Sequence, residues 1–405
     1  MNKLFIESVD LKGKKVLTRL DLNVPLDEKG NITNDKRIAA SMPSVKRIIK
    51  QGGRAILMSH LGRPKGKIVP EMSLKPVAVR MAEILGKSVT MAPDCIGDKV
   101  EALVKEMKEG DVLLLENLRF HREETENDPE FAKELSRLGD IYINDAFGSA
   151  HRAHASTEGV TKYFDIRAAG YLMKKELDFL GTALDEPKHP FTAIIGGAKI
   201  SGKIDVINAL LEKVDTLIIG GGMAYTFYKA MGLEIGDSLL EADKIELAAA
   251  LMKKAESRGL NLLLPDDCII ADSFNNEANT RIVDRDKIPA GWQGMDIGPI
   301  SIGKFSNAIK KAKTVVWNGP MGVFEMSNFA KGTNAVAFAL SEITAKGAVT
   351  VIGGGDSASA IKKAGLSDKV SHVSTGGGAS LEYMEGKVLP GVAALSEKND
   401  KVVIT

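Results

Sequence analysis

The sequence predicts an α/β protein with two domains, each built around a parallel sheet. Short apolar runs alternate with segments of helical periodicity along the chain, as expected for strands buried on both faces between helices. A length of 405 residues exceeds what one ordinary hydrophobic core serves. Arginine and histidine gather in the first half, whereas runs of glycine follow the apolar segments of the second half. We therefore expect the two halves to bind different ligands.

The apolar runs define the expected strands. In the first half they read KKVLTRLDLNV, RAILMSH, SVTMAP, DVLLLENLRF and DIYINDAFG, and in the second FTAIIGG, DTLIIGGG, LNLLLPDDCII, KTVVWNGP, AVTVIGGG and SHVSTGGG. About five strands precede residue 165 and about six follow residue 190. Intervening segments such as EFAKELSRLG carry apolar residues at helical spacing. A linker helix is expected over about residues 170–184.

Composition excludes several classes of protein. With 44% apolar residues, 26% charged residues and a net charge of +1, the chain is typical of a soluble globular protein and not of a nucleic-acid scaffold. Cys95 and Cys268 are far apart, which argues against a disulfide framework or a zinc cluster and for a reducing compartment. No signal peptide and no run of about 20 apolar residues is found. We expect a cytoplasmic protein without a membrane or nucleic-acid partner.

Four glycine turns of the second half indicate a nucleotide site. IIGGAK, IIGGGMA, VIGGGDSA and STGGGAS each follow an expected strand and precede a helical segment. The carboxyl ends of parallel strands share one edge, where ligands bind, and glycine lets backbone N–H groups approach them. Helix N-termini at that edge favour anions. A single such turn is explained by tight packing alone, but four on one edge favour a nucleotide.

Two common nucleotide motifs fit this half only in part. GGAKISGK begins like a P-loop but has Ile204 where a magnesium-binding Ser or Thr is needed. GGGDSA matches a dinucleotide fingerprint, but no acid ends the following strand, which disfavours a nicotinamide dehydrogenase. Lys199 and Lys203 are four residues apart and are predicted to share a face of a helix start. Asp356 is either a helix N-cap or a Mg²⁺ ligand.

Basic groups end the strands of the first half and indicate a small acidic ligand. Asp21 and Asn23, two apart, face one side of a strand. Later strand ends carry His60 with Arg63, then Arg119, then His151, Arg152 and His154, and Arg37 lies at an expected helix start. Arginine presents paired donors to carboxylate and phosphate oxygens. We therefore predict a transfer enzyme that closes over a nucleotide and a small acid, with no general base if the acceptor is an ionised carboxylate.

Taken together, the motifs resemble the phosphoglycerate kinase family. The strings RLDLNVP, SHLGRP, LENLRF, NDAFGSAHRAHAS, GGAKISGK, GGGMAYTF, WNGPMGVFE and GGGDSASA occur in family order between about residues 10 and 390. The resemblance implies two Rossmann-like domains that face each other across a cleft. It also implies a monomer that bends at a hinge and transfers a phosphoryl group reversibly from 1,3-bisphosphoglycerate to Mg-ADP, giving 3-phosphoglycerate and ATP in glycolysis.

The resemblance also implies domain limits and site residues. The phosphoglycerate domain would comprise residues 1–168 with 390–405, and the nucleotide domain residues 169–389. Phosphoglycerate would be held by Asp21, Asn23, Arg37, His60, Arg63, Arg119 and Arg152. The transferring phosphoryl would meet Lys199, Arg37, Gly376 and Gly377. The nucleotide and its Mg²⁺ would meet Lys203, Gly221, Gly294, Asn318, Pro320, Val323, Glu325 at the ribose, Gly353, Gly354, Gly355, Asp356 as the metal ligand, and Ser357. Gly202 departs from the family, where an acidic residue is frequent.

Two other functions remain as alternatives. One is a nucleotide-binding protein on the same scaffold that lacks catalysis, which would bind nucleotide and form no ATP. The other is the dehydrogenase, which would bind a nicotinamide cofactor. Ligand titration and an assay in the ATP-forming direction separate the three.

Overall fold

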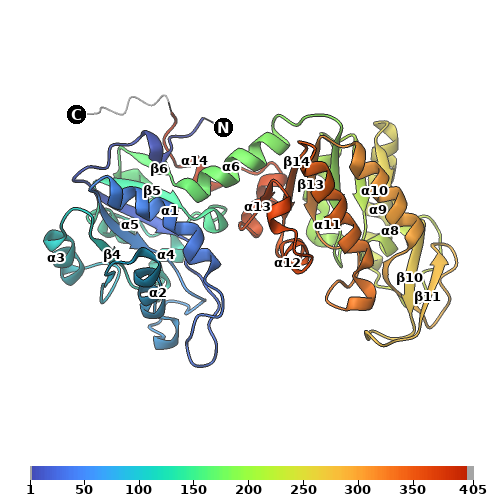
Figure 1. Ribbon diagram of the computed structural model, residues 1–405, viewed down its shortest axis with the longest axis horizontal. Helices are drawn as coiled ribbons and strands as arrows, with labels where there is room; N and C mark the ends of the chain where they lie inside the picture. Colours follow the sequence, from blue (N-terminus) through green and yellow to red (C-terminus); the bar gives the residue numbers. More distant parts are fainter. Residues whose placement is uncertain (1, 399–405) are drawn as a thin grey trace. The chain divides into compact units, whose positions relative to one another are not determined.

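The computed structural model describes residues 2–398, and the chain divides into two compact units (Figure 1). Unit 1 comprises Met1–Asp178 with Val388–Thr405, and unit 2 comprises Phe179–Lys387. The sequence placed these limits at 168/169 and 389/390; residues 399–405 of the expected first domain lie outside the described residues. No helix in the described part is long and apolar enough to cross a membrane.

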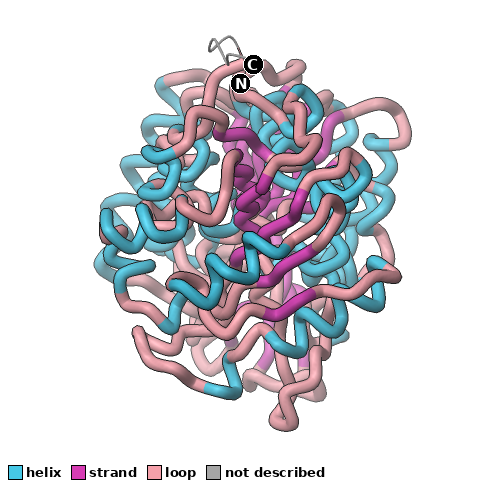
Figure 2. The backbone as a smooth tube through the Cα atoms, turned by 90° about the vertical axis from the view of Figure 1, so that its left-hand side faces the viewer, coloured by secondary structure: helices cyan, strands magenta, loops and turns pink. Residues whose placement is uncertain are grey.

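Unit 1 is built on a parallel sheet of six strands in the order β3-β4-β2-β1-β5-β6. Its central strands are apolar and almost wholly buried, as expected for strands covered on both faces. In Figure 2 the strands lie in the interior with helices on both sides. The strands are β1 (Lys15–Leu20), β2 (Arg54–Met58), β3 (Thr90–Met91), β4 (Val112–Leu114), β5 (Ile141–Asp145) and β6 (Arg167–Ala169).

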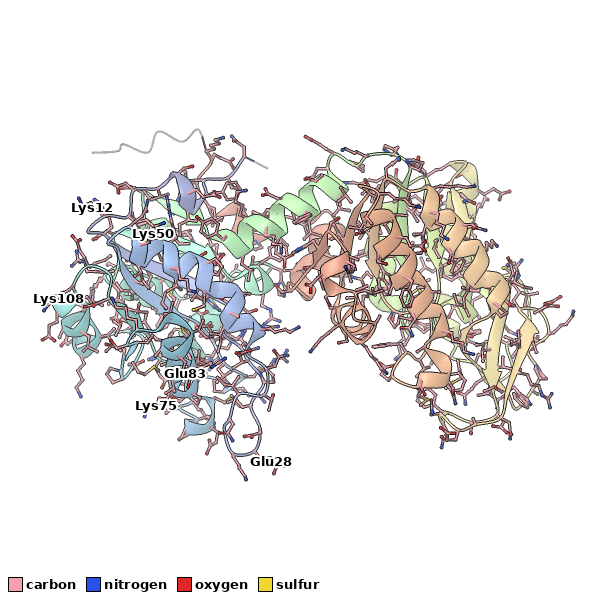
Figure 3. All side chains as sticks on the ribbon, in the orientation of Figure 1. Lys12, Glu28, Lys50, Lys75, Glu83 and Lys108 are labelled. Carbon is pink, nitrogen blue, oxygen red and sulfur yellow. The ribbon has the colours of Figure 1, made fainter. Side chains whose placement is uncertain are left out.

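Helices of unit 1 follow these strands and bury one apolar side against them. Ile38, Met42, Val45 and Ile48 of α1 recur at helical spacing and are buried in the core. Charged side chains such as Lys12, Lys50 and Lys108 project outward (Figure 3). The α-helices are α1 (Lys36–Lys50), α2 (Lys75–Leu85), α3 (Asp98–Glu106), α4 (Glu123–Glu126), α5 (Pro129–Ser136) and α14 (Pro390–Ala393), and the 3-10 helices are η1 (Ile6–Ser8), η2 (Pro70–Met72), η3 (Leu118–Phe120), η4 (Phe147–Ser149) and η5 (Gly159–Tyr163).

Unit 2 contains a second parallel sheet of six strands in the order β15-β14-β13-β7-β8-β9. Its core includes Trp317, which is fully buried. The strands are β7 (Phe191–Ile195), β8 (Thr216–Ile219), β9 (Asn261–Leu263), β13 (Thr314–Asn318), β14 (Val349–Gly353) and β15 (His372–Val373). The α-helices are α7 (Ile204–Leu211), α8 (Ala224–Ala230), α9 (Ile245–Ser257), α10 (Pro299–Lys311), α11 (Lys331–Thr344), α12 (Gly355–Lys363) and α13 (Gly378–Met384), with η6 (Ser201–Lys203), η7 (Ala242–Lys244), η8 (Ser327–Phe329) and η9 (Ser367–Lys369).

Unit 2 also contains a small antiparallel sheet, which the sequence did not predict. β10 (Asp267–Ala271) pairs with β11 (Thr280–Asp284) on one side and with β12 (Gln293–Ile297) on the other. The run LNLLLPDDCII, expected as one strand, is in fact two: β9 joins the parallel sheet and β10 joins the small one. Pro265 lies between them, and proline cannot continue a central strand because it lacks an N–H group.

The helix α6 (Tyr171–Leu184) runs through the residue at which the two units divide. Its bounds agree with the helix expected over about residues 170–184. The helix begins where the buried Asp145 accepts hydrogen bonds from the backbone N–H groups of Leu172 (2.8 Å) and Met173 (3.0 Å). A carboxylate at this position satisfies N–H groups that have no partner inside the helix.

Candidate active site

Basic side chains of unit 1 meet at the carboxyl ends of its strands. A cavity of about 330 Å³ is lined by the predicted Arg63, Arg119 and Arg152, together with Lys65, Gly66, Thr125 and His154. These residues follow β2, β4 and β5, whose carboxyl ends share one edge because the strands are parallel. No lining residue is acidic, so the cavity suits an anion. We call it the cationic cavity.

The other predicted residues of unit 1 are not among those that line this cavity. Arg37 contacts Asp21 through Nη1 and Oδ2 at 2.5 Å. Asn23 accepts a hydrogen bond from the backbone N–H of Gly62 (2.9 Å), which fixes the loop after β2. In this structure Asp21 therefore forms an ion pair with Arg37, and Asn23 holds the backbone of Gly62. Direct contact of either residue with a ligand stays a prediction.

Arg119 is held in place while part of its guanidinium stays without a partner. Its Nη1 donates to the carbonyl oxygen of Gly62 (2.8 Å), whereas its Nε is buried and forms no hydrogen bond with the described residues. Burial, followed by the charges of Arg19 and Arg152, lowers the pKa of Arg119 to about 10. The group stays cationic at neutral pH, and its buried N–H donor is suited to an anionic oxygen.

Arg19, which the sequence analysis missed, fixes the state of His60. Arg19 is fully buried on β1, and its Nη2 contacts Nδ1 of His60 at 2.9 Å. A guanidinium can only donate, so Nδ1 accepts and the imidazole proton lies on Nε2. Burial, followed by the charges of Arg19 and Arg119, holds the pKa of His60 well below its usual value. His60 is thus a neutral donor and not a general base.

A buried carboxylate balances Arg19. Glu124 is fully buried and accepts hydrogen bonds from Ser156 through its backbone N–H (2.9 Å) and its hydroxyl (2.7 Å). The Ser156 hydroxyl oxygen accepts in turn from Nε of Arg19 (2.9 Å). Burial raises the pKa of Glu124. Arg19 could have been found from the sequence. It precedes Asp21 by two residues, as Asp21 precedes Asn23, and it is a cation in an apolar strand.

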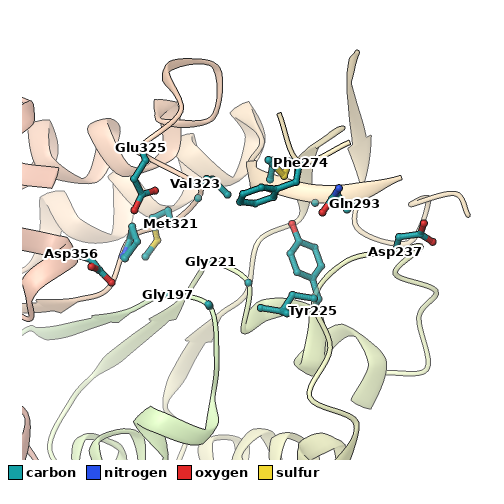
Figure 4. Close-up of a pocket in the computed structure, with 17 residues that line it drawn as sticks. Gly197, Gly221, Tyr225, Asp237, Phe274, Gln293, Met321, Val323, Glu325 and Asp356 are labelled. Atoms are coloured by element: carbon teal, nitrogen blue, oxygen red, sulfur yellow. The ribbon is translucent and has the colours of Figure 1, made fainter. Parts of the chain in front are cut away.

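The second cavity lies in unit 2, at the carboxyl ends of β7, β8 and β13 (Figure 4). It measures about 470 Å³, and glycines and apolar side chains make up most of its lining. The predicted residues among its lining are Gly221, Gly294, Pro320, Val323, Glu325 and Asp356. The sequence analysis missed Tyr225, Phe274, Gln293, Met295 and Met321, which also line it. We call it the glycine-lined cavity.

Backbone packing explains why glycine is required at the base of this cavity. Gly319 has a φ of +102°, and a Cβ there would overlap the backbone of Gly196. Gly221 has a φ of +69°, and its Cβ would lie 2.6 Å from backbone atoms of Gly197. The turns after β7, β8 and β13 therefore touch backbone to backbone, which only glycine allows. This close packing forms the base of the cavity.

The half-buried Lys203 and the buried Asn318 form a pair beside the N-terminus of α12. The Lys203 ammonium donates to Oδ1 of Asn318, and burial lowers the pKa of Lys203, against the opposing effect of Asp356. Nδ2 of Asn318 is buried and has no partner among the described residues. A Cβ on Gly354, the N-cap of α12, would lie 3.3 Å from this nitrogen. A donor without a partner, Nδ2 of Asn318, and the Lys203 ammonium thus lie beside a helix N-terminus, which suits a phosphate group.

Lys199 differs from Lys203, and one prediction about the pair is wrong. The helix α7 begins only at Ile204, so Lys199 lies in the loop after β7 and Lys203 ends the 3-10 helix η6. The two lysines therefore do not share the face of a helix start, because the chain first turns through Ser201–Lys203. Lys199 is exposed, and its ammonium forms no hydrogen bond or ion pair with the described residues.

The remaining predicted residues lie near the same edge of the sheet. α13 begins at Gly378 after Gly377, which has a φ of +51°, so the glycines at 376–378 form a helix start as expected. Ser357 is buried and accepts a hydrogen bond from the backbone N–H of Gly319 (2.6 Å), which supports a turn of the cavity. Gly353 ends β14, and Gly355 begins α12.

A cavity suited to an anion in one α/β unit and a glycine-lined cavity beside a helix N-terminus in the other are what a nucleotide-dependent phosphotransferase requires. The family model described as phosphoglycerate kinase matches residues 6–387. The chain is 58% identical to phosphoglycerate kinase of Chlorobaculum tepidum over 397 residues, which covers 98% of this chain and 100% of that protein. It is 59% identical to the cytosolic phosphoglycerate kinase of Triticum aestivum over 388 residues, 96% of each chain. The chain therefore belongs to the phosphoglycerate kinase family.

Solved structures agree with this result. The phosphoglycerate kinase of Coxiella burnetii matches with a TM-score of 0.90 at 41% identity, covering 97% of this chain and 98% of that one. That of Pyrococcus horikoshii matches with a TM-score of 0.81 at 31% identity over the same shares. The two-domain α/β fold is confirmed. The predicted activity is confirmed as well: the chain is a kinase of glycolysis that uses a carboxyl group as the phosphoryl acceptor.

Proposed function

We propose that the cationic cavity of unit 1 binds the phosphoglycerate and that the glycine-lined cavity of unit 2 binds ADP or ATP. The observation that carries this assignment is the opposite chemistry of the two cavities. One is lined by four cationic side chains, Arg63, Lys65, Arg119 and Arg152, and by no acid. The other is lined mainly by glycines and apolar side chains, together with three carboxylates and no cationic side chain, beside the Lys203–Asn318 pair. A phosphate with a carboxylate suits the first, and a purine nucleoside suits the second.

Within the cationic cavity, Arg63, Arg119 and Arg152 bind the phosphate of the phosphoglycerate. Beside the residues that line the cavity, the Nε2–H group of His60 donates a hydrogen bond to the ligand, and Asp21 and Asn23 bind the polar groups at the other end of the ligand. Arg37, at the start of α1, binds the carboxyl group that gains or loses the phosphoryl. The support is their common place at the carboxyl edge of the sheet and the fixed, neutral state of His60.

Within unit 2, the adenosine lies against Gly221, Gly294, Pro320 and Val323, and Glu325 accepts from the ribose hydroxyls. Lys203, Asn318 and the start of α12 at Gly353–Ser357 bind the phosphates. Glu325 and Asp356 are both exposed carboxylates on the lining (Figure 4), so both face a ligand in this cavity. Nδ2 of Asn318, which has no hydrogen-bond partner among the described residues, supplies a donor for one phosphate oxygen.

The residues present fit a magnesium ion. Asp356 offers one hard carboxylate oxygen beside the place proposed for the phosphates, and Mg²⁺ usually takes one or two carboxylates with the remaining ligands from phosphate and water. When bound, the ion would neutralise charge on the nucleotide phosphates. Asp356 is the residue that would hold it.

The transfer needs positioning and charge stabilisation. A β-phosphate oxygen of ADP attacks the acyl phosphorus, a P–O bond to ADP forms, the bond to the acyl oxygen breaks, and the carboxylate of 3-phosphoglycerate leaves. No proton moves, which agrees with neutral His60 and His154. We propose that Lys199, Arg37, Gly376 and Gly377 stabilise the transferring group once the units close and exclude water. The enzyme is proposed to act as a cytoplasmic monomer.

Calorimetric titration of two variants tests the assignment of the two cavities. Arg119→Ala should weaken the binding of 3-phosphoglycerate and leave that of Mg-ADP unchanged, whereas Glu325→Ala should do the reverse. Each variant is the control for the folding of the other. Loss of both ligands in both variants, or of the wrong ligand in either, contradicts the assignment.

A further inference from the structure

Lys65 lies in the loop between β2 and α2, and it lines the cationic cavity with three arginines. We infer that Lys65 is a further substrate-binding residue, whose ammonium strengthens the binding of the dianionic phosphate of phosphoglycerate. This inference rests on the proposed function of the cationic cavity. The segment RPKGK read alone predicts only a charged surface loop, and nothing in its pattern distinguishes Lys65 from Lys67.

The backbone of Lys65 is in an unusual conformation. Its φ is +57°, and Asn127 is the other non-glycine residue with positive φ in the described part of the chain. This left-handed region is common for glycine and asparagine but disfavoured for lysine, because Cβ approaches the carbonyl oxygen. Such residues persist where their surroundings hold them, and they gather at ligand sites.

Two hydrogen bonds fasten the loop to Arg119. The carbonyl oxygen of Gly62 accepts from Nη1 of Arg119 (2.8 Å), and the N–H of Gly66 donates to the carbonyl oxygen of Arg119 (3.2 Å). On the far side, a Cβ on Gly66 would lie 2.8 Å from Cβ of Arg122, so the loop packs closely against Arg122 there. The backbone of Lys65 is thereby placed at a fixed position relative to Arg119.

The charge of Lys65 is available to a ligand. Its ammonium forms no ion pair or hydrogen bond with any described residue, and no acidic side chain lines the cavity. His154 adds no charge at neutral pH, because burial and the neighbouring arginines lower its pKa to about 4. Lys65 is therefore the fourth cation of the cavity. Because its side chain is exposed, solvent and salt screen its attraction, and a moderate effect is expected.

The backbone conformation provides a sharp test. Lys65→Asn removes the charge with a residue that tolerates positive φ, and Lys65→Arg keeps the charge. Lys67→Asn and Lys108→Asn remove one charge each from the same unit and serve as controls; neither lines the cavity, and Lys108 lies on the outer surface (Figure 3). The dissociation constant for 3-phosphoglycerate is measured by calorimetry at low and high salt, together with the melting temperature.

Lys65→Asn should weaken binding by about three- to tenfold at low salt, with a difference that shrinks as salt rises. Its melting temperature should not fall, since asparagine relieves the backbone. Lys65→Arg should bind like the wild type, and both control variants within about twofold of it. A lysine with a merely structural role would show the opposite: a lower melting temperature and no salt dependence.

Two results overturn the inference. One is tight binding by Lys65→Asn while Arg119→Ala binds weakly, and the other is an equal loss in Lys65→Asn and Lys67→Asn. Unchanged binding by Arg119→Ala would instead contradict the proposed function of the cavity itself, so the two failures can be told apart.

Discussion

Replacing Lys199 and Lys203 separately by methionine distinguishes stabilisation of the transferring group from binding of the nucleotide. Methionine keeps much of the length of lysine and removes its charge. Lys199 is exposed and has no partner among the described residues, whereas Lys203 is half-buried and donates to Asn318. The same substitution should therefore have different consequences at the two positions.

The magnitudes follow from these environments. Lys203→Met leaves a buried amide oxygen without its donor, which costs about 1–3 kcal/mol of folding free energy and also weakens ADP binding. Lys199→Met removes an exposed side chain, so stability should change by less than about 0.5 kcal/mol. If Lys199 contacts the charge that develops during transfer, its loss should lower kcat by about 10²–10³-fold, or about 3–4 kcal/mol of activation free energy.

The assay combines urea unfolding with steady-state kinetics of both variants under saturating 3-phosphoglycerate. Lys199→Met should unfold like the wild type, keep its KM for nucleotide and lose turnover. Lys203→Met should lose stability and show a raised KM for nucleotide. Turnover of Lys199→Met within about tenfold of the wild type would refute the role proposed for Lys199, as would a loss of stability equal to that of Lys203→Met.

Three further predictions concern groups around the cavities. Arg19→Met should raise the pKa of His60 by removing an adjacent charge, so that the pH dependence of KM for 3-phosphoglycerate moves to higher pH than in the wild type; a KM profile that does not move would contradict this prediction. Burial raises the pKa of Asp296 from 3.8 to about 7. In the folded state Asp296 therefore keeps its proton at pH values where the unfolded chain has lost it. The stability that protonated Asp296 contributes is fully present below about pH 4 and is lost as pH rises through about 7. Asp296→Asn should gain unfolding free energy relative to the wild type by up to about 1.4 kcal/mol per pH unit across that window, and a constant difference in urea unfolding would contradict this. Gly319→Ala should destabilise the protein by more than about 2 kcal/mol, because its Cβ meets a neighbouring backbone. Gly347→Ala has a similar φ of +88° and free space around its Cβ, so equal losses for both would disprove the steric argument.

Much of the fold is predictable because the parallel strands are buried on both faces. Their continuous apolar runs, such as AVTVIGGG for β14, differ clearly from the helical segments between them. The same pattern does not predict the antiparallel sheet. β11 is largely exposed and carries charged residues, so TRIVD does not read as an apolar run. Pro265 marks the boundary between β9 and β10, although the sequence analysis predicts one strand for the run LNLLLPDDCII.

The candidate site is predictable where residues stand at strand ends. Parallel strands bring their carboxyl ends to one edge, so Arg63, Arg119 and Arg152 could be grouped from their positions alone. The strand-end pattern does not predict Arg19 and Glu124, because both are buried and interact with each other through hydrogen bonds to Ser156. Tyr225, Phe274 and Gln293 were missed for a different reason. They reach the glycine-lined cavity from a helix, a loop and the antiparallel sheet, which the strand-end pattern does not include.

One measurement tests the central claim most directly: formation of ATP from 1,3-bisphosphoglycerate and ADP, followed with and without Mg²⁺. We predict rapid ATP formation that requires the metal. Arg119→Ala should impair it mainly through KM for the bisphosphoglycerate, and Lys199→Met through kcat. Binding of both ligands by the wild type with no ATP formed in the presence of Mg²⁺ would contradict it.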